Sequence, residues 1–309
     1  MLRTVLLRAA GNERIKDAAL AVPLTRAVVE RFIAGETAED ALAAARRLTD
    51  DGLLVTVDHL GEHTRERAAA ERVTVAYLEL LQAVRTAGLG PQVEVSVKLS
   101  ALGQLLPGDG ESVAVEQARL ICAAARNAGT TVTVDMEDHT TTASTLAVVE
   151  ELRQDFPQTG AVLQANLRRT EADCERLAHS GSRVRLCKGA YASPEEVAYR
   201  PGAEVDLSYV RCLRVLMEGL GYPMVATHDP RLVAIAQDLA NRNHREPGSW
   251  ELQMLHGIRP EEQRRLVAAG HQVRVYLPYG TDWYGYMVRR MAEKPANLAL
   301  FLRGLTSRR

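Results

Sequence analysis

Charged side chains follow two short apolar segments of the chain, at positions where they could do chemistry. Lys98 lies between apolar neighbours, so we expect it to point inward or toward the mouth of a barrel. A lysine in such a place could form a Schiff base or stay charged against a carboxylate. Asp135 ends the next apolar segment and is the natural ion-pair partner of Lys98, whereas Glu137 and Asp138 are expected to cap a helix or to lie in a loop.

A second group of candidate residues combines a cation, exposed backbone and a histidine. Arg185 and Gly189 share one face of an extended segment because side chains alternate with a two-residue period. The pair Gly189-Ala190 lets backbone come close to a ligand. His228 ends another apolar segment, and we expect it to contact a ligand there. These residues therefore indicate a ligand site at the mouth of the barrel.

Two adjacent arginines near the C-terminus form a third candidate group. Arg289 and Arg290 differ by about 100° around a helix, and their planar guanidinium groups suit a carboxylate or a phosphate. Glu293 can hold either arginine through an intrahelical ion pair, although a solvated surface pair is the alternative interpretation. The chain has no GxGxxG, GxxxxGK[ST] or HExxH motif, so nothing supports a Rossmann domain, a P-loop or a zinc protease.

About eight short apolar segments, alternating with helices, must position these residues. Near-continuous apolar segments are typical of strands that are buried on both faces of a parallel sheet. Polar residues gathered at one end of each strand are how a (β/α)8 barrel builds an active site. We therefore predict an α/β protein with a (β/α)8 TIM barrel and extra N-terminal helices. The segments are residues 53–59, 93–100, 131–138, 161–167, 183–189, 223–229, 250–257 and 272–280.

Helix start signals between the segments support this alternation. Residues 16–47 are predicted to form amphipathic helices that cover one end of the barrel, with Thr37 as an N-cap. Thr170 and Asp229 are predicted N-caps of later helices, the second followed by a proline. The sequence Ser-Pro-Glu-Glu at 193–196 has the form of a capping box and predicts a further helix.

Length and composition predict one domain and exclude several classes of function. We expect a single domain over residues 1–309, with N-terminal helices in 1–50 and the barrel in 51–309, because no linker divides the chain. The formal net charge of −1 argues against a nucleic-acid partner. No apolar stretch reaches the roughly 20 residues of a membrane span, and no signal peptide is evident. The four cysteines lack metal-site spacing and are expected to be buried in a reducing cytoplasm.

Seven segments, taken together, resemble the bacterial proline dehydrogenases. Their barrel also forms a domain of the bifunctional proline catabolic enzymes. The segments occur in the family's order, and the resemblance covers roughly Leu53 to the C-terminus. It implies a distorted (β/α)8 barrel, a final helix laid over the strand C-terminal ends, and oxidation of L-proline to Δ1-pyrroline-5-carboxylate. The segments are VSVKLSALG, VTVDMEDH, VLQANLRRTEAD, RVRLCKGAY, MVATHD, ELQMLHGIR and RVYLPYGTDWYGYMVRRMAEKPAN.

The resemblance also implies roles for residues at matching positions. Asp135, beside Lys98, and Arg185, near the flavin N5, would be the catalytic residues, and the positive charge of Arg185 would stabilise the anionic reduced flavin. The residues implied to hold the proline carboxylate, wall its ring or orient an arginine are Lys98, Arg289, Arg290, Tyr276, Tyr191 and Glu293. The residues implied to bind FAD are Met136, Gln164, Arg185, Lys188, Gly189, Ala190, Thr227, His228 and Gln253.

Cofactor, partners and location follow from the same resemblance. It implies non-covalent FAD, a membrane quinone as the electron acceptor, and a separate pyrroline-5-carboxylate dehydrogenase that takes the product. It also implies a cytoplasmic protein that can contact the inner face of the cell membrane. The residues themselves leave two other functions open. One is a Schiff-base aldolase that uses Lys98 or Lys188; the other is a non-catalytic barrel that binds a small carboxylate. A flavin absorption band would argue against both.

Overall fold

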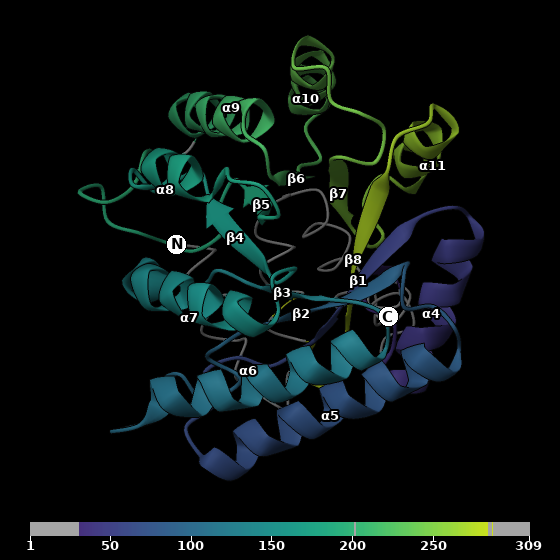
Figure 1. The fold of residues 1–309 in the computed structure, drawn as a ribbon, viewed down its shortest axis with the longest axis vertical. Coiled ribbons are helices and arrows are strands. Elements are labelled where there is room, and N and C mark those ends of the chain that lie inside the picture. Colours follow the sequence, from purple (N-terminus) through teal and green to yellow (C-terminus); the bar gives the residue numbers. More distant parts are fainter. Residues whose placement is uncertain (1–30, 201, 284–285, 287–309) are drawn as a thin grey trace, which may run out of the picture.

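Eight parallel strands close into a barrel in the computed structural model, which describes residues 31–200, 202–283 and 286 (Figure 1). Neighbours in sequence are neighbours in the barrel, and β1 closes it by pairing with β8. The predicted α/β barrel is therefore confirmed. The strands are β1 Leu54–His59, β2 Val93–Val97, β3 Val132–Val134, β4 Gly160–Gln164, β5 Arg183–Cys187, β6 Tyr222–Ala226, β7 Glu251–Leu255 and β8 Val273–Tyr279.

Helices surround the strands: α4 precedes β1, and the other helices lie in the connections between successive strands (Figure 1). Several predicted strands were too long at their carboxyl ends. Lys98, Asp135, Lys188 and Thr227 each directly follow a strand instead of belonging to it. The helices are α4 Ala38–Asp50, α5 Arg67–Thr86, α6 Gly110–Asn127, α7 Thr142–Asp155, α8 Thr170–Leu177, α9 Ala203–Glu218, α10 Pro230–Arg242 and α11 Pro260–Ala268, with a short 3-10 helix η1 at His139–Thr141.

The described part of the N-terminal region packs along the side of the barrel. Helix α4 lies against the outer face of β1 and β8, beside α5, and its alanines join the hydrophobic core (Figure 1). We predicted that residues 16–47 would cover one end of the barrel. For α4 this was wrong, because its apolar face covers the seam where the barrel closes. Residues 1–30 lie outside the described residues.

The predicted helix caps had mixed outcomes. Thr37 forms a capping box with the third residue of α4, and Asp229 caps α10 by accepting from the Arg231 amide, as predicted. Thr170 was predicted wrongly as a cap, because its hydroxyl donates to the Gln164 carbonyl at 2.5 Å. Residues 193–196 lead into a turn and not a helix. The reason is that Ala198, just after them, forms an antiparallel bridge with Leu167 in the loop that follows β4.

Apolar side chains fill the space between the strands and the helices, and polar ones fill the barrel. Outward-facing residues such as Val55 and Val95 are fully buried under the helices. Two helical tyrosines also reach strand backbone: Tyr77 donates to the Ser96 carbonyl at 2.6 Å and Tyr209 to the Leu186 carbonyl at 3.0 Å. A TIM barrel interior is usually packed with branched apolar residues. The polar interior of this barrel is therefore unusual and indicates a role beyond simple packing.

Two further predictions concern membranes and cysteines. Among the described residues, no helix has the length and apolarity needed to cross a membrane. Cys122, Cys174 and Cys212 are buried in helices, as expected, whereas Cys187 in β5 is only partly buried. None of the four cysteines forms a disulfide within the described part of the chain.

Candidate active site

Charged and polar side chains inside the barrel form two layers. They come from every second position of the strands, because side chains alternate between the two faces. We call the group nearer the strand N-terminal ends the lower layer and the group nearer the C-terminal ends the upper layer. The lower layer is Glu94, Arg183, Glu251 and Arg274. The upper layer is Asp58, Lys98, Asp135, Arg185 and Tyr276.

The lower layer is a set of paired charges. Arg183 Nη2 lies 2.7 Å from Glu94 Oε2, and Arg274 Nε lies 2.7 Å from Glu251 Oε1. Glu94 Oε1 also accepts from the Thr56 hydroxyl at 2.8 Å. Burial alone would raise the pKa of Glu94, but the neighbouring arginines outweigh it and lower that pKa to about 2. Two carboxylates thus balance two guanidinium groups in a buried and structurally closed layer.

Lys98, at the end of β2, finds its main partner on β1. Its Nζ lies 2.7 Å from both carboxylate oxygens of Asp58, but 3.8 Å from Asp135 Oδ2. The predicted pairing with Asp135 is therefore only the weaker of two contacts. The reason is that β2 has two neighbours in a closed barrel, and the carboxylate of β1 comes closer. An ammonium group has three donors, so Asp58 leaves one N–H of Lys98 for another acceptor.

Asp135, after β3, connects the two other chemically capable groups of the upper layer. Its Oδ1 accepts from Arg185 Nη1 at 2.7 Å, and its Oδ2 accepts from the Tyr276 hydroxyl at 2.6 Å. The Arg185 guanidinium also lies over the Tyr276 ring, 5.3 Å from its centroid, which is a cation–π distance. The two predicted catalytic residues are therefore in direct contact.

Three N–H groups of the Arg185 guanidinium donate hydrogen bonds, and those of Nη2 do not. Its Nε donates to Gln253 at 2.6 Å, and its Nη1 donates to Ser96 at 3.1 Å as well as to Asp135. Its Nη2 is buried and makes no hydrogen bond among the described residues, although it lies 3.5 Å from Glu94 Oε1. An unsatisfied buried donor is costly unless a ligand or a water completes it. This atom is therefore a candidate donor for a bound acceptor, with Glu94 as its nearest charged partner in the protein.

The ionisation of the upper layer favours a charged lysine. Burial opposes a positive charge on Lys98, but the carboxylates of Asp58, Asp135 and Glu62 outweigh this effect and raise the pKa of Lys98. Burial raises the pKa of Asp58 to about 6, an effect that Lys98 counteracts and Asp135 reinforces. Lys98 therefore stays protonated at neutral pH.

The carboxylates after Asp135 differ in what they do. Glu137 is buried and accepts from the Ser100 hydroxyl at 2.6 Å and from the Ser100 amide at 3.2 Å, so it fixes the loop that follows β2. Asp138 accepts from the Thr140 amide and caps η1. Gln164, at the end of β4, donates to the Glu137 carbonyl at 2.8 Å, and Met136 is buried beside them. Of the two open alternatives, the cap thus applies to Asp138 and a buried loop anchor to Glu137.

The end of β5 has a backbone conformation that suits close approach of a ligand. Gly189 has a φ of +100°, and a Cβ there would lie 2.0 Å from Asn166 Oδ1, so the position requires glycine. Asn166 Oδ1 is itself buried without a hydrogen-bond partner among the described residues. Lys188 Nζ lies 2.5 Å from Asp206 in α9 and 3.5 Å from Asp229, the N-cap of α10. Its ammonium group is therefore directed toward these two helices.

The end of β6 presents a hydroxyl and an imidazole. The Thr227 hydroxyl accepts from the Asp229 amide at 3.1 Å, and His228 Nε2 accepts from the Leu255 amide at 2.9 Å. An amide can only donate, so the proton of a neutral His228 lies on Nδ1. Ala190 is exposed and Tyr191 is half-buried after β5. Predictions for the following residues stay predictions, because they and the expected final helix lie outside the described residues: Arg289, Arg290 and Glu293.

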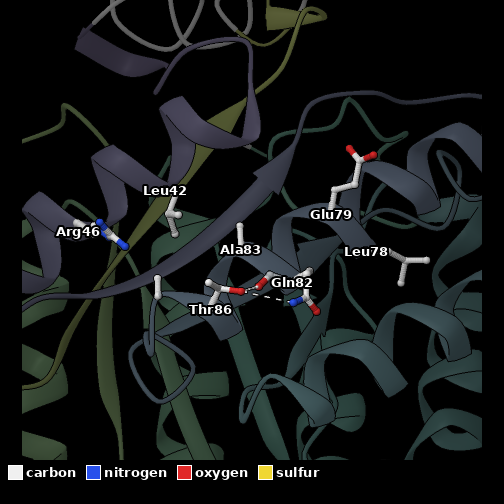
Figure 2. A pocket seen from close by; sticks show the side chains of 8 residues that line it. Leu42, Arg46, Leu78, Glu79, Gln82, Ala83 and Thr86 are labelled. Atoms are coloured by element: carbon white, nitrogen blue, oxygen red, sulfur yellow. Dashed lines mark hydrogen bonds between the residues drawn. The ribbon is translucent and has the colours of Figure 1, made fainter.

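Two further cavities lie away from the upper layer. A surface groove of about 600 Å³ lies between α4 and α5, where Leu42 and Arg46 face Glu79 and Thr86 (Figure 2). The hydrogen bonds drawn in Figure 2 join Gln82 and Thr86, which lie on the same helix. The second cavity, of about 630 Å³, opens at the strand N-terminal ends and is lined in part by Glu94, Arg183 and Arg274 of the lower layer, whose charges are already paired with one another or with Glu251. Active sites of TIM barrels lie at the opposite end.

Sequence reasoning missed several interior residues that had a readable signal. Asp58 follows Thr56 in β1, and Glu94 precedes Ser96 in β2, so polar residues stand at every second position among valines. Glu251 and Arg274 follow the same pattern in β7 and β8. This alternation distinguishes an inward polar face from an outward apolar face, and it could have identified both layers.

Comparison with known proteins agrees with this geometry. The sequence model of the proline dehydrogenase family matches residues 41–301. The chain is 36% identical to proline dehydrogenase 1 of Bacillus subtilis over 99% of both chains. It is 38% identical to proline dehydrogenase of Deinococcus radiodurans over 90% of both chains. The crystal structure of proline utilization A from Bdellovibrio bacteriovorus matches with a TM-score of 0.81 at 26% identity, covering 92% of this chain and 34% of that one.

The family match also bears on the activity. It spans all eight strands and the positions of both layers, and the relatives with nearly full-length matches are proline dehydrogenases. The chain is thus an enzyme that oxidises proline. We conclude that this chain belongs to the proline dehydrogenase family.

Proposed function

We propose that the chain binds FAD non-covalently above the upper layer and oxidises L-proline to Δ1-pyrroline-5-carboxylate there, passing the electrons to a membrane quinone. Proline oxidation follows from the family; the flavin, the acceptor and the residue roles are our proposal. The observation that carries it is Arg185, whose guanidinium is fixed by three partners while Nη2 keeps unused donors.

The residues at the strand ends fit a flavin nucleotide. Arg185 Nη2 offers a buried donor and Asn166 Oδ1 a buried acceptor, and neither has a hydrogen-bond partner among the described residues. Gly189 keeps the end of β5 free of a side chain that would hinder a flat ring system. The residues that would hold the cofactor are Met136, Gln164, Arg185, Lys188, Gly189, Ala190, Thr227 and His228.

Lys98 would bind the proline carboxylate as a charge. Asp58 holds two of its N–H groups, which fixes the direction of the third. A carboxylate placed on that N–H gains a charge-assisted hydrogen bond in a site of low dielectric. By the family resemblance, Arg289 and Arg290 would complete this carboxylate site, and Glu293 would orient an arginine. Fixing one end of a small rigid substrate also fixes its reacting carbon.

Asp135 and Tyr276 would shape the rest of the substrate site. The Tyr276 ring is held by the hydroxyl contact to Asp135 and by the guanidinium of Arg185, so it can form one wall for the proline ring. Tyr191 would form another wall. When bound, FAD supplies the acceptor for the hydride that leaves the proline ring. Arg185 contributes a fixed positive charge beside that acceptor, which favours the added negative charge.

The structure argues against the two alternative functions. A Schiff base requires a neutral amine, but the pKa of Lys98 is raised and two of its donors are bound to Asp58. Lys188 is paired with Asp206 and lies outside the upper layer. A non-catalytic carboxylate-binding barrel does not account for the match to the proline dehydrogenase family over residues 41–301.

The quinone, the downstream enzyme and the location rest on the family resemblance. Reduction of a membrane quinone requires contact with the membrane surface, so we propose a cytoplasmic protein that binds peripherally to the inner face. The product would pass to a separate pyrroline-5-carboxylate dehydrogenase. Sedimentation with quinone-containing vesicles, in the presence and absence of proline, tests the membrane contact directly.

A spectrum of the purified protein tests the proposal as a whole. The protein should carry a flavin absorption band, release FAD on denaturation, and lose the band when L-proline is added without oxygen. D-proline, whose carboxylate cannot reach the same groups with the ring in place, serves as the control. A colourless protein that FAD does not reconstitute would refute the flavin, and a bound flavin that L-proline fails to bleach would refute the proposed substrate site.

A further inference from the structure

Gln253, on β7, connects the lower layer to the upper layer in only one possible orientation. Its Oε1 accepts from Arg185 Nε at 2.6 Å, and its Nε2 donates to Glu251 Oε1 at 2.6 Å. A guanidinium can only donate and a carboxylate can only accept, so a reversed amide would lose both bonds. The side chain is buried, so water cannot replace these contacts.

Glu251 is fixed from below, which gives the Gln253 amide a rigid base. One carboxylate oxygen also accepts from Arg274 Nε at 2.7 Å, and the other accepts from the Tyr222 hydroxyl at 3.0 Å. A continuous chain of hydrogen bonds thus runs from the lower end of the barrel through Glu251 and Gln253 to Arg185. Such networks stiffen the groups that they contain when every member is satisfied.

The last hydrogen bond of this series, from Arg185 to Gln253, helps to set the orientation of the Arg185 guanidinium. Gln253 holds Nε, Asp135 and Ser96 hold Nη1, and the plane of the guanidinium is therefore defined by contacts at two of its three nitrogens. Only Nη2 is without a hydrogen bond. Without Gln253, the guanidinium could turn about its Nη1 contacts toward Glu94, which already lies 3.5 Å from Nη2.

We propose that Gln253 is a positioning residue that fixes the plane of the Arg185 guanidinium beside the proposed cofactor site and prevents it from turning toward Glu94. This differs from the contact with the FAD itself that the family resemblance implies, and it rests on the proposed function of Arg185. Both ends of the amide are already engaged inside the barrel, so the side chain acts through Arg185.

The first test is Gln253→Met, which keeps the size of the side chain and removes the amide. The kcat for proline should fall about tenfold, with the KM changed by less than about twofold, because the substrate carboxylate site is untouched. A second readout needs no cofactor. In ¹⁵N-arginine-labelled protein, the Arg185 Hε signal, identified by its absence from Arg185→Lys, should exchange slowly with water in the parent protein and at least about tenfold faster in Gln253→Met.

Matched variants separate positioning from general stability. Gln263 is another buried glutamine, and its Nε2 donates to the carbonyls of Leu255 at 3.2 Å and Ile258 at 2.9 Å, so it supports the end of the same strand. Gln263→Met should lower the stability but leave kcat and the Arg185 Hε signal unchanged. Gln253→Glu restores an acceptor for Arg185 Nε, so it should keep the Hε protected even though it opposes Glu251. If Gln253→Met does not fold, the Hε exchange of Gln253→Glu provides the test instead.

A double-mutant cycle completes the test. In the Arg185→Lys background, which has no Nε, Gln253→Met should change kcat by less than about twofold. Unchanged Hε exchange in Gln253→Met, or an equal loss of kcat in Gln263→Met, would overturn the proposal. If the parent protein neither binds FAD nor oxidises proline, the proposed function fails, but the Hε exchange still decides whether Gln253 holds Arg185.

Discussion

In the lower layer of the barrel, Arg183 and Arg274 lie 2.7 Å from the carboxylates of Glu94 and Glu251, respectively, and the cavity below opens away from the strand C-terminal ends. In the upper layer, Lys98 and Arg185 are also paired with carboxylates, but one N–H of Lys98 and the Nη2 of Arg185 are left over. Both layers pair carboxylates with cationic side chains, and the formal charges balance in both. What differs is that the upper layer contains a buried donor without a hydrogen bond, Arg185 Nη2, whereas none of the four lower-layer side chains has a buried polar atom in that state.

This difference explains why one barrel can contain two sets of buried charges. A closed set of ion pairs can fill a core without attracting a ligand, because each charge is already compensated. A set with surplus donors, at the end of the barrel where strands stop and loops begin, attracts an anionic or acceptor-rich ligand. The predictions below ask whether the two layers separate in this way.

The largest effect should come from unpairing the lower layer. Arg183→Met leaves Glu94 buried without its 2.7 Å partner, and removing one member of a buried pair costs about 3–5 kcal/mol of the free energy of unfolding. Urea unfolding measures this loss. The matched control is Asp238→Asn, which breaks an exposed ion pair with Arg242 and should cost less than about 1 kcal/mol. Equal losses in the two variants would mean that the interior pairs have no special role in stability.

Acid should weaken the same layer in a predictable direction. The pKa of Glu94 is lowered from 4.5 to about 2 in the folded protein, so Glu94 contributes stability above pH 4.5 that is lost as the pH falls toward 2. A depression of this size is worth on the order of 3 kcal/mol. Stability measured against pH should therefore fall less steeply between pH 4.5 and 2 in Glu94→Gln than in the parent. A parallel decline in both proteins would remove Glu94 from the explanation.

The anchor of Lys98 should matter next. Asp58→Asn keeps the shape but leaves a buried ammonium with the more distant Asp135 as its charged partner. We expect a loss of about 2–3 kcal/mol in stability, since hydrogen bonds to charged groups are worth about 1.5–3 kcal/mol. Thr56 lies two residues before Asp58 on the same face of β1. Thr56→Val therefore tests whether removing any buried polar group from this strand has the same effect. Asp58→Asn should be the more costly of the two.

The smallest effect should come from Tyr276→Phe. It removes the hydroxyl that donates to Asp135 at 2.6 Å but keeps the ring that stacks on Arg185. Losing one hydrogen bond to a charged group costs about 1.5–3 kcal/mol, but this bond is to Asp135 and not to the substrate. Only part of the cost should therefore reach proline binding, and we expect the KM for proline to rise about tenfold or less while FAD stays bound. Steady-state kinetics and the flavin spectrum measure both quantities. A variant that loses its flavin would show that Tyr276 holds the cofactor and not the substrate.

The sequence predicted much of this fold because strand cores, helix caps and alternation are local properties. The starts of strands such as Val93 and Arg183 could be read directly, and so could the cap at Asp229. The failures have a common cause. Asp58 was overlooked as the partner of Lys98 because the closing of the barrel, and not the sequence distance, decides which strand lies beside β2. The Ser-Pro-Glu-Glu turn failed because tertiary pairing at Ala198 overrode a local helix signal.

One paired titration tests the account most directly. L-proline is added without oxygen to the flavin-loaded variants Lys98→Met and Arg183→Met, and the flavin band is followed. Lys98→Met should need about ten- to hundredfold more proline for half-bleaching. Arg183→Met should need nearly the parent concentration, although it unfolds at lower urea. An unchanged titration for Lys98→Met, or a shifted one for Arg183→Met, would contradict the division of the barrel into a binding layer and a structural layer.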